Sequence, residues 1–141
     1  MMAQLGMLVL RVVVGFTFAM HGWQKFSEFT IAGTQAAFRN LGVPLADIAA
    51  PGLATVELVG GIALILGVLT RIFAALFIVF DMLGAMFFVH RTHGFFVANN
   101  GIELVLLLAA ACLLFVLAGA GLYSVDHKLF GGRRSRWGRL A

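Results

Sequence analysis

The sequence predicts an all-α integral membrane protein, a four-helix bundle with a short interfacial helix in its first outer loop. Of the 141 residues, 62% are hydrophobic and 11% are charged, whereas a soluble domain carries about 45–50% apolar and about 25% charged residues. The apolar residues also form four continuous runs, and runs of about 17–25 residues are long enough to cross a bilayer. We therefore expect one membrane domain, residues 1–124, followed by a basic tail, residues 125–141.

The four predicted spans cover residues 4–21, 52–69, 72–89 and 102–119, and their connections differ in character. Only "TR" (Thr70–Arg71) separates the second span from the third, which predicts a tight helical hairpin. The first loop contains "GTQAAFRNLGVP", which reads as a short interfacial helix whose apolar side faces the membrane. The third loop, "HRTHGFFVANNG", suits a lid at the interface. The residues of the first loop expected to face the membrane are Ala36, Ala37, Phe38 and Leu41.

The basic residues predict the orientation. An even number of spans places both termini on one side, and basic residues favour the cytoplasmic side of a membrane. Six lie on the side of the termini and three on the other, so we expect both termini in the cytoplasm of a bacterial inner membrane. The tail "KLFGGRRSRWGRL" is expected to face anionic lipid headgroups, and no nucleic-acid partner is expected. The six are Arg71, Lys128, Arg133, Arg134, Arg136 and Arg139, and the three are Lys25, Arg39 and Arg91.

Each predicted span carries an ionisable residue at or near membrane depth. An arginine at the centre of a bilayer helix costs about +2.5 to +3.5 kcal/mol, so such a group needs a partner or a function. At 100° per residue, the charges of the first three spans, Arg11, Glu57 and Asp81, share helix faces with glycine or alanine, as in Arg11 with Gly15 and Gly22. We expect these faces to point into the bundle. Arg11 is predicted to pair with Asp81, Glu57 or both in a structural charge network.

A second set of polar residues lies toward the outer ends of the spans and predicts a pocket for the head group of a quinone. His21 or His90 would exchange protons with the ligand, because the pKa of histidine lies near neutral pH. Lys25 would stabilise negative charge on a ligand oxygen, and Arg11 with Glu57 would hold the floor. The catalytic candidates are thus His21, Lys25 and Glu57, and the ligand-binding candidates are Arg11, His90, Asn100 and Glu103, with His93, Asn99, Phe95 and Phe96 nearby.

Other readings of the same residues remain open. The buried charges could serve only helix packing. Haem and metal sites are disfavoured, because His90 and Asp81 project from opposite sides of the third span and Lys25 lies near His21. Cys112 is the single cysteine, so no internal disulfide or CxxC pair can form.

Four sequence blocks resemble the DoxX family of small bacterial membrane proteins: "LRVVVGFTFAMHGWQK", "FRNLGVP", "ELVGGIALILGVLTR" and "NGIELVLLL". The resemblance covers nearly the whole chain. It implies a four-helix membrane bundle and a role as a membrane subunit of an oxidoreductase system. One similar protein belongs to a thiosulfate:quinone oxidoreductase, and another joins a superoxide dismutase and a sulfurtransferase-like thiol enzyme. The family pattern highlights Arg11, Gly15, His21, Gly22, Lys25, Glu57, Gly60, Gly61, Thr70, Arg71, Asn100 and Glu103.

Three functions follow as hypotheses. The first is a quinone-linked membrane subunit of an oxidoreductase that works with soluble redox or thiol enzymes. The second is a non-catalytic membrane scaffold for such enzymes, and the third is a small oligomeric transporter. Whether the chain is an enzyme by itself stays open. Small residues on the helix faces also allow a homodimer.

Overall fold

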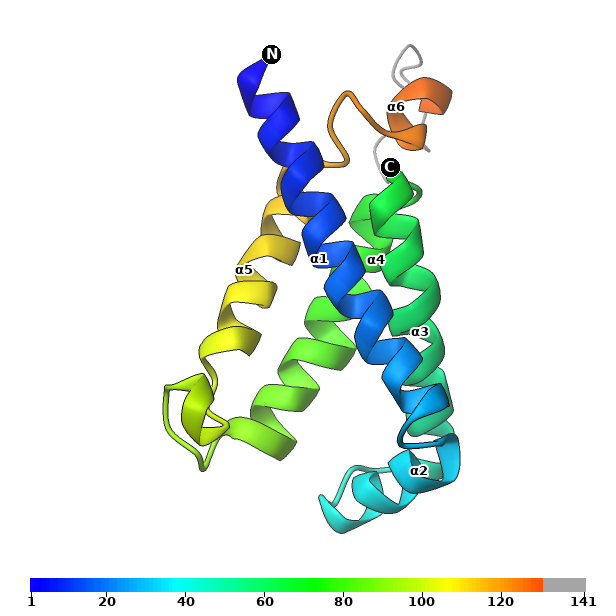
Figure 1. Ribbon diagram of the computed structural model, residues 1–141, viewed down its shortest axis with the longest axis vertical. Helices are drawn as coiled ribbons and strands as arrows, with labels where there is room; N and C mark the ends of the chain where they lie inside the picture. The colour runs from blue at the N-terminus through cyan, green and yellow to red at the C-terminus, as the bar shows by residue number, and fades with distance from the viewer. Residues whose placement is uncertain (131–141) are drawn as a thin grey trace.

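The computed structural model describes residues 1–130 and contains helices and loops but no strand in that range. Four helical segments run up and down between two ends (Figure 1). They are α1 (Met2–Ser27), α3 (Ala46–Leu66), the third span (Thr70–His90) and α5 (Glu103–Ala118). Met1, the turn between α3 and the third span, and α6 (Val125–Phe130) lie at one end, which we call the N-terminal end. The predicted all-α membrane bundle is confirmed.

Three of these segments are long and apolar enough to cross a membrane. They have 26, 21 and 21 residues, and 21 residues rise about 32 Å in an α-helix, close to the thickness of the hydrocarbon core. The fourth, α5, is apolar but has only 16 residues. The predicted tail begins in α6, and its residues 131–141 lie outside the described part of the chain.

Helices α1 and α3 pack closely because glycines line their contact. A methyl group added to Gly22 would lie 2.4 Å from the Leu58 nitrogen, and one on Gly61 would lie 2.4 Å from the Ala19 nitrogen. One on Gly15 would lie 2.7 Å from the Gly61 carbonyl oxygen. Only glycine allows backbones to approach this closely. The small-residue faces of these two helices therefore point into the bundle, as predicted.

The core between the helices is aromatic and aliphatic. Phe18 of α1 stacks on Phe77 of the third span, with the ring centroids 3.8 Å apart. Cys112 of α5 is buried in the same cluster and forms no disulfide. The outward faces carry large exposed apolar side chains such as Phe16 and Leu117, which is what a lipid-facing surface requires.

The third span is not a uniform α-helix. It starts as α4 (Thr70–Leu76), continues through the π-helical η1 (Phe77–Met82), and ends in the π-helical η2 (Ala85–His90). A π-helix is wider than an α-helix, is rare, and often marks a functional position. Asp81 lies inside η1, and the sequence carries no signal for this irregularity.

The predicted interfacial helix is present as α2 (Ile31–Asn40), and it is held against the start of α3. Pro51 lies inside α3 and has no N–H to donate to a carbonyl one turn back. The Asp47 carbonyl oxygen accepts a hydrogen bond from the Gln35 side chain of α2 instead, at 2.9 Å. Arg39 forms an exposed ion pair with Asp47. These contacts let α3 begin at Ala46, six residues before the predicted start of the second span, and fix α2 beside it.

Candidate functional site

Arg11 is buried at the N-terminal end of the bundle, and its partners differ from the predicted ones. Only 1% of its surface is exposed. Its guanidinium donates to the carbonyl oxygens of Ala120 and Tyr123, the second at 2.6 Å. The predicted pairing with Glu57 or Asp81 is wrong. The segment after α5 folds back over this end. The carbonyl groups of Ala120 and Tyr123 take no part in a helix, so they are free to accept hydrogen bonds from the guanidinium.

This segment, Gly119–Asp126, which we call the return segment, is tied to the rest of the bundle at several points. The Asp126 carboxylate accepts hydrogen bonds from the backbone N–H groups of Leu69 and Thr70, at 2.8 and 3.0 Å. The backbone N–H of Asp126 donates to the Gly67 carbonyl oxygen at 2.9 Å. Asp126 thereby caps the free N–H groups at the start of α4. The return segment closes the N-terminal end around Arg11.

Gly67 is the residue that makes room for this arrangement. Its φ is +71°, a conformation that glycine adopts without strain. A methyl group at this position would lie 2.5 Å from both Arg11 Nη1 and the Ser124 Cβ. Helix α3 therefore ends at the glycine of "ILGVLTR" for two reasons. Glycine adopts the positive φ of the turn, and it leaves room for the buried guanidinium of Arg11.

A second set of buried charges lies toward the other end of the bundle and joins three helices. Lys25 of α1 forms an ion pair with Glu57 of α3, with its Nζ 2.8 Å from Oε1 and 2.7 Å from Oε2. Their side chains are 16% and 2% exposed. Asp81 of the third span is 8% exposed and lies close enough to Glu57 and Lys25 to interact with their charges. We call Lys25, Glu57 and Asp81 the charged triad.

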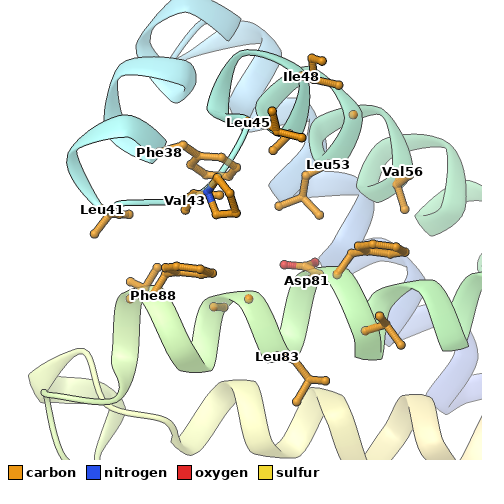
Figure 2. Close-up of a pocket in the computed structure, with 18 of the residues that line it drawn as sticks. Phe38, Leu41, Val43, Leu45, Ile48, Leu53, Val56, Asp81, Leu83 and Phe88 are labelled. Carbon is orange, nitrogen blue, oxygen red and sulfur yellow. The ribbon is translucent and has the colours of Figure 1, made fainter.

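The charged triad borders a cavity of about 800 Å³ between α2, α3 and the third span (Figure 2). Lys25 and Asp81 are the ionisable side chains among its lining residues, and the walls are otherwise apolar. Figure 2 shows the Asp81 carboxyl between the third span and α3, with Leu53 and Val56 opposite. Aromatic and aliphatic side chains complete the walls, among them Phe38, Leu41, Pro44, Phe80, Leu83 and Phe88.

The rim of the cavity is apolar and exposed. Leu45, Ile48 and Phe80, which all line it, are 77%, 71% and 63% exposed. These residues belong to the start of α3 and the middle of the third span, where the surface of a membrane bundle meets hydrocarbon rather than water. The cavity therefore opens on an apolar surface of the bundle.

The remaining predicted site residues fall into two groups, neither of which lines the cavity. His21 is exposed on α1, one turn before Lys25, and it interacts electrostatically with Lys25 and Glu57. His90 and Glu103 hold the loop after the third span. His90 Nδ1 donates to the Asn100 carbonyl oxygen at 2.6 Å, and Glu103 accepts from the Val97 N–H at 2.8 Å.

The apolar walls of the cavity are not among the predicted site residues, although one signal for them exists in the sequence. Phe80, Gly84 and Phe88 are four residues apart, so they share one face of the third span. A glycine between two aromatic side chains leaves a notch, and no atom lies within 4 Å of where a Gly84 Cβ would be. All three residues line the cavity.

Comparison with known proteins finds relatives over most of the chain. The DoxX family model matches residues 6–91. A Haemophilus influenzae protein is 40% identical over 124 residues, which cover 86% of this chain and 88% of the relative. The Bacillus subtilis protein named "Putative oxidoreductase CatD" is 32% identical over 132 residues, covering 94% and 92%. The Escherichia coli "Inner membrane protein YqjF" is 32% identical over 124 residues, covering 88% and 92%. No solved structure matches the chain significantly.

Proposed function

Since this chain belongs to the DoxX family of membrane proteins, we propose that it is a quinone-linked membrane subunit of an oxidoreductase system. The observation that carries the proposal is the apolar cavity of about 800 Å³ with Lys25 and Asp81 in its wall. One relative carries the name "Putative oxidoreductase CatD", which agrees with the proposal. The electrons would come from a soluble redox or thiol enzyme at the membrane surface.

The physical properties of the cavity favour a lipid-soluble ligand with a small polar head. Its volume is in the range of about 300–1,000 Å³ that ligand pockets occupy. Its walls and exposed rim are apolar, so a ligand could enter from the bilayer without crossing water. A quinone meets these demands, because its isoprenoid tail is apolar and its ring carries two carbonyl oxygens.

Lys25 and Asp81 supply the polar contacts for the ring. The ammonium of Lys25 would donate to one ring oxygen and stabilise the negative charge that develops there on reduction. Glu57 is 2% exposed and holds the ammonium in place through the ion pair. His21, exposed one turn before Lys25, would exchange protons between this region and water. Orientation by the basic residues would place this half of the bundle toward the outer leaflet.

The proposal is tested by filling the cavity from a position with free space. Gly84→Phe adds a ring where the glycine leaves the notch. Gly6→Phe is the matched control, since Gly6 is also helical, also has no neighbouring atom within 4 Å of where its Cβ would be, and does not line the cavity. The measurement is the quinone extracted per mole of protein purified from membranes, determined by mass spectrometry.

We expect the wild type and Gly6→Phe to retain quinone and Gly84→Phe to retain at least about tenfold less, which corresponds to about 1.4 kcal/mol of binding free energy. Equal retention by both variants would place the quinone elsewhere. A wild-type protein that retains none, and binds none when a short-chain quinone is added, would refute the function.

A further inference from the structure

Three consecutive apolar side chains are exposed on the loop between the third span and α5. This loop covers residues 91–102, and we call it the aromatic loop. Phe95, Phe96 and Val97 are 50%, 64% and 54% exposed, and the two rings pack edge to face with their centroids 5.3 Å apart. None of residues 91–102 lines the cavity. A contiguous exposed apolar patch indicates contact with another apolar surface, so the aromatic loop is a candidate interaction surface separate from the cavity.

The length of α5 places the aromatic loop near the edge of the hydrocarbon layer. Arg71, at the start of the third span, donates to the Leu117 carbonyl oxygen at 3.4 Å, so the end of α5 is level with the start of the third span. The 16 residues of α5 rise about 24 Å, whereas the hydrocarbon core is about 30 Å thick. Helix α5 therefore starts short of the opposite membrane surface, and the aromatic loop has to cover the remaining depth. In Figure 1, α2 extends farther from the N-terminal end than the aromatic loop does, which agrees with this depth.

The backbone of the aromatic loop suits this depth, because many of its N–H groups are bonded within the loop itself. Little water is available beside acyl chains, so unpaired N–H and C=O groups are costly there. The Phe96 carbonyl oxygen accepts from the N–H groups of Asn99 and Gly101, each at 3.0 Å. Gly101 lets the chain fold this tightly, since a methyl group on it would lie 2.5 Å from the Phe95 carbonyl carbon. The N–H groups that donate within the loop and to its ends are those of residues 93, 97 and 99–103.

Other side chains of the aromatic loop are polar, and they limit how deep it can lie. Thr92, His93 and Asn99 are exposed and need water or lipid headgroups as partners. At the start of the loop, the Arg91 guanidinium lies 4.6 Å from the centroid of the Phe87 ring, and a basic side chain at the end of a span extends to the headgroups. A segment with an apolar and a polar side lies at the boundary between headgroups and acyl chains.

We propose that the aromatic loop is a membrane-binding surface, with Phe95, Phe96 and Val97 among the acyl chains of the lipid and the polar side chains of the loop at the headgroups. The apolar surface of the loop continues the outward face of α5, where Leu104 and Leu107 are 42% and 65% exposed. This continuity favours lipid over a second copy of the chain or a soluble enzyme, because the bilayer already covers the face that the loop extends.

Spin labels on single cysteines test the depth of the loop in the full-length protein, reconstituted into vesicles of phosphatidylethanolamine and phosphatidylglycerol. The label reports its collisions with molecular oxygen, which concentrates among acyl chains, and with a water-soluble nickel chelate. Val97→Cys places the label beside the two phenylalanines, and Thr92→Cys is the matched control on the same loop. Leu107→Cys on α5 gives the lipid reference, and Glu28→Cys, directly after α1, gives the water reference, since both side chains are exposed. The wild type, treated in the same way, corrects for any label on the buried Cys112.

We expect the label at Val97 to give the oxygen-to-nickel collision ratio of the Leu107 reference, and the label at Thr92 to give that of the Glu28 reference. A Val97 label that meets the nickel chelate as the Glu28 label does would place the loop in water and overturn the proposal. Protection of the Val97 label from both reagents would show that a second copy of the chain covers the loop, which also overturns it. Equal ratios at Val97 and Thr92 would contradict the division of the loop into two sides.

Removal of the two rings tests whether they hold the loop in the lipid. In the double variant Phe95→Ser with Phe96→Ser, we expect the collision ratio at Val97 to shift from the lipid reference to the water reference, while the ratio at Leu107 stays unchanged. An unchanged ratio at Val97 would overturn the anchoring role of the rings. Neither measurement involves quinone, so the results stand apart from the quinone-retention test.

Discussion

Arg11 and Lys25 are cations of α1, about four helical turns apart. Arg11 is buried and Lys25 is half-buried, and their hydrogen-bond partners differ. Arg11 donates to backbone carbonyl groups and is packed on Gly67, and the nearby Asp126 carboxylate is itself held by two backbone N–H groups. Lys25 is paired with a side-chain carboxylate, next to a second carboxyl and a cavity. Backbone partners cannot change their charge or move away, whereas carboxyl groups can take up and release protons. A buried charge that is bound to backbone carbonyl groups stabilises the structure, whereas one that is paired with a carboxyl group is available for proton transfer.

Among the substitutions at the N-terminal end of the bundle, the comparison predicts the largest loss of stability at Arg11. Arg11→Ala removes two hydrogen bonds from a charged donor, each worth about 1.5–3 kcal/mol, and leaves the carbonyls of Ala120 and Tyr123 without it. We expect the free energy of unfolding in detergent to fall by roughly 3 kcal/mol or more. The return segment should become sensitive to limited proteolysis, which mass spectrometry of the fragments would detect.

Arg11→Ala should lower the stability of the protein but not the affinity of the folded protein for quinone. We expect the retained quinone per folded molecule to change less than about twofold, since Arg11 does not line the cavity. Loss of quinone from a variant that unfolds as the wild type does would reverse the assignment and give Arg11 a ligand-binding role.

We expect a smaller loss of stability when Gly67 is replaced by alanine. The same substitution at Gly42 separates the effect of backbone strain from that of steric contact. Gly67 and Gly42 have φ values of +71° and +75°, so alanine at either position costs about 1–2 kcal/mol of backbone strain. Only at Gly67 would the new methyl group meet other atoms, at 2.5 Å from Arg11 Nη1. Thermal unfolding should show Gly67→Ala less stable than Gly42→Ala by about 1 kcal/mol or more. Equal losses would mean that both the guanidinium and Ser124 move aside freely.

The same contrast explains which parts of the structure the sequence predicts. The four helical segments, the interior faces of α1 and α3, and the interfacial helix follow from local properties, namely apolar run length and the spacing of glycines such as Gly15 and Gly22. Lys25 and Glu57 stand out in the sequence because a charge in an apolar run is conspicuous. Their functional roles stay predictions.

The partners of the buried charges could not be predicted, because they depend on the path of a loop. The similar depth of Arg11 and Asp81 in the membrane predicts that the two residues pair. Depth does not predict the path of the return segment. Every residue has a carbonyl oxygen, so no sequence pattern shows which of them will accept from Arg11. No sequence pattern predicts the π-helical turns around Asp81 either. They depend on how the third span packs against its neighbours, so the cavity beside them became visible only in three dimensions.

Asp126 tests whether the return segment needs its cap. Asp126→Ala removes the carboxylate that accepts from the Leu69 and Thr70 N–H groups, and loss of such a cap costs about 0.5–2 kcal/mol. We expect a decrease of about 1 kcal/mol in the free energy of unfolding, smaller than for Arg11→Ala. Combining both substitutions should give less than the sum of the single effects, because they loosen the same segment. Full additivity would show that cap and guanidinium act independently.

The smallest effect on stability is expected when both charges of the Lys25–Glu57 pair are removed together. Replacing a buried ion pair by uncharged side chains of similar size is often neutral, whereas removing one partner leaves an uncompensated charge and costs about 3–5 kcal/mol. Lys25→Met should therefore be clearly less stable than the wild type, and Lys25→Met with Glu57→Gln should unfold within about 1 kcal/mol of it. The double variant should nevertheless retain at least about tenfold less quinone, because the ammonium donor is gone. A double variant that is stable and still holds quinone would show that the triad, like Arg11, serves only packing, and the contrast between the two ends of α1 would disappear.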